Sequence, residues 1–81
     1  MVLTLIGKPD CHLCEDARVV IRDVLTETAG VTLEERSILD DQALHDRYWD
    51  EIPVLLIDGR VHTIWRVDAD RLRTALAAAQ Q

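Results

Sequence analysis

The sequence predicts an α/β domain with a four-stranded mixed sheet and helices on both faces. Two unbroken apolar runs, Val2–Ile6 and Pro53–Ile57, have the length of strands, and strands that are apolar throughout are covered on both faces. Between and after these runs, apolar residues recur with helical spacing. Asp58-Gly59 is a two-residue turn of the kind that joins antiparallel strands. The expected order is strand, helix, strand, helix, strand, strand, helix.

The first strand, Val2–Ile6, is followed by a loop with Gly7 and Pro9 and then by a helix. The apolar positions of this helix are Leu13, Ala17, Val20, Ile21, Val24 and Leu25. We expect the helix to end at Ala29 and Gly30, because glycine readily adopts the left-handed cap conformation. Val31–Leu39 is then expected to form a second strand, whose charged centre suits a sheet edge.

Aspartates mark the beginnings of the two later helices. Asp40 or Asp41 can cap a short helix that continues to Tyr48, because a carboxylate accepts hydrogen bonds from the free N–H groups of a first turn. Asp68 is expected to cap a last helix, with apolar residues on one face as far as Ala79.

A hairpin lies between these two helices. Pro53–Ile57 and Arg60–Trp65 flank the turn, and a proline is tolerated at the first position of a central strand. The two continuous apolar strands should therefore lie in the middle of the sheet. The charged second strand and the alternating fourth strand take its edges.

Composition excludes several classes of function. The 81 residues make one domain, 1–81, with 48% apolar residues, 30% charged residues and a net charge of -6. An acidic chain lacks the basic surface that nucleic-acid binding needs. No run of about 18 apolar residues could span a membrane, and the N-terminus lacks a basic leader. We therefore expect a cytoplasmic monomer without nucleic-acid or membrane partners.

The segment GKPDCHLC, residues 7–14, contains both cysteines of the chain, Cys11 and Cys14. Cytoplasmic thiols are kept reduced, and so short a loop would make a poor structural disulfide. Cys11 should lie at the helix N-terminus and Cys14 one turn later on the same face, close to disulfide reach. The helix terminus favours a thiolate on Cys11. We predict that Cys11 attacks a disulfide and Cys14 resolves the product.

The cysteines and Trp65 have other possible interpretations. A zinc site needs four ligands, and besides Cys11, His12 and Cys14 only the isolated His45 and His62 are available, so no metal is expected. An inert structural pair of cysteines is the remaining alternative. Trp65 could be a lid on the cysteine pair or a cap on the edge of the core, and we favour the core.

The pattern K-P-x-C-x-x-C on a strand-to-helix turn, with IPVLLIDG downstream, resembles the glutaredoxin branch of the thioredoxin-fold superfamily. The resemblance covers essentially the whole chain and implies a thioredoxin-like fold. It also implies that Lys8 contacts a carboxylate of glutathione and that Pro53 is cis and faces the cysteines. The backbone of Ile52 would pair with substrate as an added strand.

The chain departs from the glutaredoxin pattern in two places. His12 and Leu13 stand between the cysteines, where the family usually has proline and tyrosine. Trp65 and Arg66 stand where the family carries a glycine pair that closes on glutathione. The substrate-binding residues expected from the resemblance and the motif are Lys8, His12, Leu13, Ile52 and Pro53.

Two functions follow as hypotheses. The first is a dithiol thiol-disulfide oxidoreductase that reduces protein or glutathione mixed disulfides through Cys11 and Cys14, with no tightly bound cofactor. Glutathione, a protein dithiol or a thioredoxin-type reductase would supply electrons, and the departures disfavour glutathione. The alternative is a non-enzymatic thioredoxin-fold module that acts as a redox sensor, an adaptor or a thiol metal carrier.

Overall fold

Two apolar strands lie in the middle of a four-stranded sheet in the computed structural model, which describes residues 1–80. The strand order is β2-β1-β3-β4, with β1 parallel to β2 and the other two pairings antiparallel. The elements are β1 (Val2–Gly7), α1 (His12–Leu25), β2 (Thr32–Ser37), α2 (Gln42–Tyr48), β3 (Val54–Ile57), β4 (Arg60–Ile64) and α3 (Ala69–Ala79). The predicted mixed sheet and element order are confirmed.

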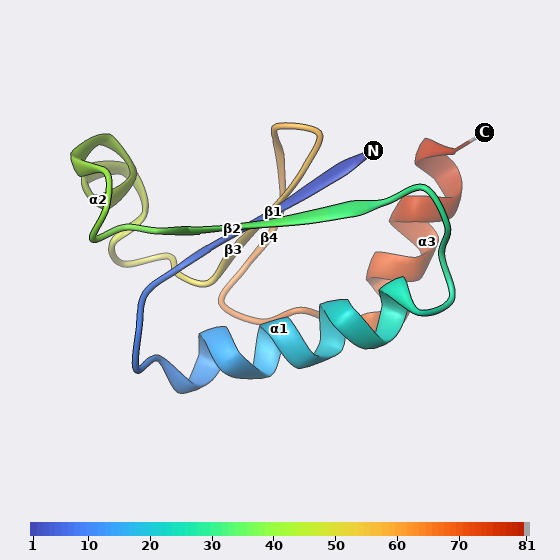
Figure 1. Ribbon diagram of the computed structural model, residues 1–81, viewed down its shortest axis with the longest axis horizontal. Coiled ribbons are helices and arrows are strands. Elements are labelled where there is room, and N and C mark those ends of the chain that lie inside the picture. Colours follow the sequence, from blue (N-terminus) through green and yellow to red (C-terminus); the bar gives the residue numbers. More distant parts are fainter. Residues whose placement is uncertain (81) are drawn as a thin grey trace.

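Helices cover both faces of the sheet (Figure 1). α1 and α3 lie together on one face, over the main core of Leu3, Leu5, Ala17, Ile21, Val24, Leu55, Leu72 and Leu76. The short α2 packs at one end of the opposite face, over Ile6, Ile38, Tyr48 and Val54. Side chains that alternate along β1 and β3 supply both clusters. Both faces of these strands are therefore covered, which explains why they are almost entirely apolar.

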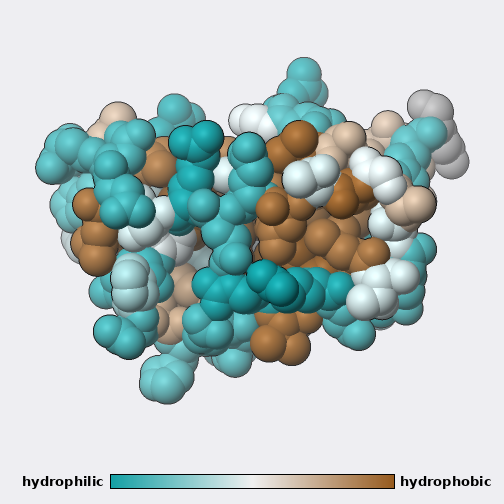
Figure 2. All heavy atoms as spheres, viewed as in Figure 1, coloured by the Kyte–Doolittle hydropathy of each residue, from teal (hydrophilic) through white to brown (hydrophobic). Residues whose placement is uncertain are grey.

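The main core is partly exposed to solvent along the β2 edge of the sheet. Figure 2 shows apolar surface between β2 and the helices α1 and α3. Leu25, Val31 and Leu33 are partly buried hydrophobic residues that pack against this core. Because β2 is an edge strand, no further strand extends the sheet over the core on that side.

α1 ends earlier than the sequence predicts. Its last residue is Leu25, whereas Ala29 and Gly30 were expected to end it. The Thr26 hydroxyl donates to the Asp23 carbonyl at 2.6 Å, and the Thr28 hydroxyl donates to the Val24 carbonyl at 3.3 Å. Such side-chain bonds compete with helix propagation, so the chain leaves the helix at these threonines. Gly30, with φ +76°, takes the left-handed conformation in the turn before β2.

The predicted turn and caps of the second half are confirmed. Asp58 and Gly59 have φ values of 47° and 84°, as a two-residue hairpin turn requires. The Asp41 side chain caps α2, and the Asp68 side chain caps α3 by accepting from the Arg71 N–H at 2.8 Å. The second strand is shorter than predicted: β2 occupies 32–37 of the expected 31–39.

The register of the sheet places the cysteine loop beside the start of β3. Ile6 near the end of β1 pairs with Val54, the first residue of β3. Because these strands are antiparallel, the loop after β1 and the residues before β3 lie at the same end of the sheet. None of the helices within residues 1–80 is both long and apolar enough to cross a membrane.

Candidate redox site

Cys11 is the N-cap of α1. Its backbone is extended, with φ -111° and ψ 112°, and its Sγ accepts a hydrogen bond from the Cys14 N–H at 3.2 Å. The Cys11 carbonyl accepts the first helical bond, from the Glu15 N–H at 3.0 Å. The first turn of a helix has free N–H groups and carries the positive end of the dipole. A negative charge on Cys11 would therefore be stabilised by the backbone.

The two thiols differ in accessibility. Cys11 is half-buried and Cys14 is 2% exposed, and both are free thiols. Burial raises the pKa of the Cys14 thiol to about 11, and a hydrogen bond with the Cys11 side chain acts in the same direction. A backbone hydrogen bond from Lys8 and the charge of Arg18 lower it. At neutral pH Cys14 is therefore a buried, protonated thiol, and Cys11 is the more accessible of the two cysteines.

Gly7 makes room for Cys14. A Cβ atom at Gly7 would lie 2.8 Å from the Cys14 Sγ and 3.2 Å from its Cβ. The first of these distances is shorter than real Cβ contacts allow, so a side chain on the last residue of β1 would force Cys14 or the strand to shift. The sequence indicated Gly7 only as a loop residue, and its role depends on a contact between strand and helix.

Ile52 and Pro53 lie at the same end of the sheet as the cysteines. The Ile52–Pro53 peptide bond is cis, as the resemblance implied. Ile52 is partly buried and packs against the second core cluster. Pro53 is buried, and its carbonyl accepts from the Trp65 N–H at 2.7 Å. The start of β3 is thereby tied to the chain that follows β4.

Trp65 lies on the surface, so the interpretation of this residue as a core cap is wrong. It is 54% exposed, and its indole N–H donates to the Asp50 carbonyl at 3.1 Å. Its φ of 68° is in the left-handed region, which places the indole outside the strand pattern of β4. Trp65 lines a groove of about 220 Å³ with Leu13, which is 39% exposed, and Arg66.

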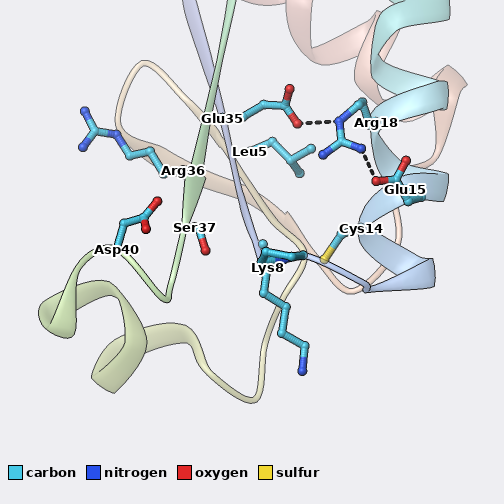
Figure 3. A pocket seen from close by; sticks show the side chains of 11 residues that line it. Leu5, Lys8, Cys14, Glu15, Arg18, Glu35, Arg36, Ser37 and Asp40 are labelled. Atoms are coloured by element: carbon cyan, nitrogen blue, oxygen red, sulfur yellow. Dashed lines mark hydrogen bonds and ion pairs between the residues drawn. The ribbon is translucent and has the colours of Figure 1, made fainter.

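The other side of Cys14 opens onto a pocket of about 330 Å³ (Figure 3). Lys8, Glu15, Arg18 and Glu35 line it together with Cys14. Figure 3 shows Arg18 reaching from α1 toward Glu35 of β2, while the Lys8 side chain extends away from Arg18. Neither Arg18 nor Glu35 is predicted from the sequence as a site residue.

A sequence signal existed for only one of these two residues. Arg18 follows Cys14 by four positions and therefore shares its helix face. Glu35 reaches the site because β1 and β2 pair in parallel with Leu5 opposite Glu35. This register could not be derived from local patterns.

The remaining predicted site residues are on the surface. Lys8 and His12 are exposed, and His12 is the first residue of α1. The cysteine loop and the start of α1, residues 8–14, lie at the same end of the sheet as the 52–53 bond. Among residues 1–80, no group of three His, Cys, Asp or Glu side chains is placed to hold a metal ion.

Comparison of this chain with known proteins identifies its family. Residues 2–77 match the Glutaredoxin-like domain (DUF836). The chain is 26% identical over 77 residues to an uncharacterised protein of Mycobacterium tuberculosis, covering 90% of this chain and 79% of that protein.

Solved structures agree. The X-ray structure of a structural genomics target protein from X. campestris is 39% identical, with a TM-score of 0.75 and coverage of 94% of this chain and 96% of that chain. Thioredoxin 1 from Thermosipho africanus has a TM-score of 0.64 at 9% identity, with both chains fully covered, and shows the thioredoxin fold alone. The chain belongs to the Glutaredoxin-like domain (DUF836) family and has a thioredoxin-like fold.

Proposed function

We propose that this protein is a thiol-disulfide oxidoreductase that uses Cys11 as nucleophile and Cys14 as resolving thiol. The observation that carries the proposal is the contact between the two residues: the Cys11 Sγ caps α1 and accepts from the Cys14 N–H, while Cys14 is buried one turn further. Helix termini of this kind lower the free energy of a cysteine thiolate, which is the attacking species in exchange.

The reaction has two exchange steps. In the first, the Cys11 thiolate attacks a disulfide R–S–S–R′, forms a mixed disulfide with R and releases R′ as a thiolate that takes up a proton. In the second, Cys14 loses its proton and attacks the Cys11 sulfur, and R leaves as a thiol. The substrate disulfide gains two electrons, and the protein is left with a Cys11–Cys14 disulfide. A dithiol then reduces this disulfide by the reverse route.

The surface around Cys11 favours an extended segment of a protein substrate. Leu13 and Trp65 line one groove, and the Ile52–Pro53 backbone lies at the same end of the sheet. Extended peptides bind such backbones by strand addition. Lys8 and Arg66 can contact carboxylates, and the exposed His12 lies beside Cys11. A protein dithiol or a thioredoxin-type reductase is the proposed electron donor, because Trp65 and Arg66 stand where the resemblance to glutaredoxins implies a glycine pair that closes on glutathione.

Trapping tests the assignment of roles. A Cys14→Ser variant mixed with a disulfide peptide should accumulate a mixed disulfide on Cys11, whereas Cys11→Ser should accumulate none. Intact-protein mass spectrometry measures both, and circular dichroism checks that both variants fold. Equal trapping by the two variants would overturn the assignment. Stoichiometric oxidation of the unaltered protein without repeated turnover would favour the non-enzymatic sensor, adaptor or metal carrier.

A further inference from the structure

Arg18 is held beside Cys14 by two carboxylates from different elements. Its guanidinium forms ion pairs with Glu15, one turn earlier on α1, and with Glu35 of β2 (Figure 3). Glu35 is approached by Arg22 as well, with Nη2 and Oε2 3.6 Å apart. Arginine presents a planar set of donors that two carboxylates can fix in one orientation. The positive charge is therefore held at one place in the pocket.

This pocket is the one that Cys14 lines. Arg18 follows Cys14 by four residues, so the two side chains are neighbours on one helix face. The charged and titratable groups around the Cys14 thiol are Cys11 at the N-cap, Lys8 in the preceding loop, Glu15 and Arg18 on α1, Glu35 and Arg36 on β2, and Asp40 after β2. Among the side chains, the charge of Arg18 lowers the pKa of Cys14, which burial raises.

We propose that Arg18 is a positioning residue for the second exchange step, where it stabilises the Cys14 thiolate that attacks the mixed disulfide on Cys11. This inference rests on the proposed function. Cys14 releases its proton to water in the pocket, and its sulfur bonds to the Cys11 sulfur. The bond between Cys11 and the substrate sulfur breaks, and the departing thiolate takes up a proton. Arg18 exchanges no electron or proton and acts through Cys14.

The proposal separates the two steps of exchange. Cys11 attacks from the outer side of α1's first turn, whereas the Arg18 pocket lies against the buried Cys14. Removal of the Arg18 charge should therefore leave the first step unchanged and slow the second. Without the charge, a smaller fraction of Cys14 is thiolate, but each thiolate is more basic and therefore more nucleophilic. The second effect offsets part of the first. The second step should slow about three- to fourfold for each tenfold decrease in the thiolate fraction.

The experiment measures the two rates separately. Stopped-flow mixing of the Cys14→Ser protein with a disulfide peptide gives the rate of attack, and decay of the mixed disulfide in the two-cysteine protein gives the rate of resolution. Arg18→Gln should slow resolution at pH 7 and move its pH profile to higher pH, with attack unchanged. Arg18→Lys should restore most of the resolution rate, because it keeps the charge.

Arg73 provides a matched control. It also bridges two carboxylates, Glu27 and Asp70, but lies on α3, and it does not line the Cys14 pocket. Arg73→Gln should leave both rates unchanged. If Arg18→Gln does not fold, the charge-balanced pair Arg18→Gln with Glu35→Gln removes Arg18 together with one of its partners. This pair should also slow resolution, but by less than the single change, because loss of the Glu35 negative charge favours the Cys14 thiolate.

The outcomes distinguish this inference from the function on which it rests. Unchanged resolution in folded Arg18→Gln, equal slowing of attack and resolution, or equal slowing by Arg73→Gln would each overturn the role of Arg18. Failure of Cys14→Ser to form any mixed disulfide would instead refute the proposed oxidoreductase.

Discussion

Gly7 and Cys14 pack so closely that a Cβ atom on Gly7 would lie 2.8 Å from the Cys14 sulfur. This contact joins the end of β1 to the first turn of α1. Because β1 pairs with a strand on each side, its backbone cannot easily shift away from α1. The depth at which Cys14 lies behind Cys11 is therefore set by the absence of a side chain at Gly7.

We predict that Gly7→Ala displaces Cys14 and slows formation of the Cys11–Cys14 disulfide. The added methyl group should also destabilise the fold by about 1–3 kcal/mol, as overpacking in a core does. The rate of disulfide formation under a fixed oxidant and urea unfolding measure the two effects.

Gly30→Ala is the control for this prediction. Nothing lies within 4 Å of a Cβ at Gly30, but its φ of +76° makes alanine strained. This variant should lose stability and keep the wild-type rate of disulfide formation. A Gly7→Ala protein that forms its disulfide as fast as Gly30→Ala does would contradict the prediction.

Local sequence patterns predicted most of the fold because each pattern constrains its own segment for a physical reason. The apolar runs 2–6 and 53–57 needed covering on both faces, and Asp58-Gly59 could form only a tight turn. The end of α1 was missed because Gly30 was expected to be the helix cap. The apolar periodicity stops at Leu25, the last helical residue, and the Thr26 and Thr28 hydroxyls then bond to backbone carbonyls.

The candidate site was only partly predictable. Cys11 and Cys14 are placed by one local feature, the turn from strand to helix. Glu35 comes from β2, and only the parallel register brings it to Arg18. Trp65 was misplaced because apolar character suggested burial, whereas its positive φ and its bond to the Asp50 carbonyl hold it at the surface.

The reduced protein should lose stability above pH 9. The pKa of Cys14 is about 11 in the folded state, against an ordinary value near 9.0. Between these values the unfolded chain gives up the thiol proton and the folded chain keeps it, so unfolding becomes more favourable as pH rises. Below pH 9 both states are protonated and the effect is absent. The loss should reach roughly 2 kcal/mol by pH 11.

Urea unfolding under reductant, from pH 7 to 11, checks this loss against a Cys14→Ala protein. The alanine variant should be less stable at pH 7 because of the cavity it leaves, and should decline less above pH 9. Parallel pH curves for the two proteins would show that Cys14 does not titrate as stated.

We predict that the Trp65 indole limits the use of glutathione as electron donor. Trp65 has a φ of 68°, which glycine adopts without cost, and its indole lines the groove beside Leu13. Trp65→Gly should therefore open the groove at the position where glutaredoxins are expected to carry a glycine pair. Glutathione-coupled turnover of a mixed disulfide should rise about tenfold, which corresponds to regaining roughly 1.4 kcal/mol of binding.

Stability should change little in this variant, because loss of the indole hydrogen bond is offset by relief of the left-handed backbone. Trp49→Ala is the control, since Trp49 is also exposed but does not line the groove with Leu13. It should leave glutathione turnover at the wild-type level. The measurement supplies glutathione and a protein dithiol in turn to each variant. If the wild-type protein already turns over as fast with glutathione as with the dithiol, or if folded Trp65→Gly gains nothing, the indole is not what limits glutathione.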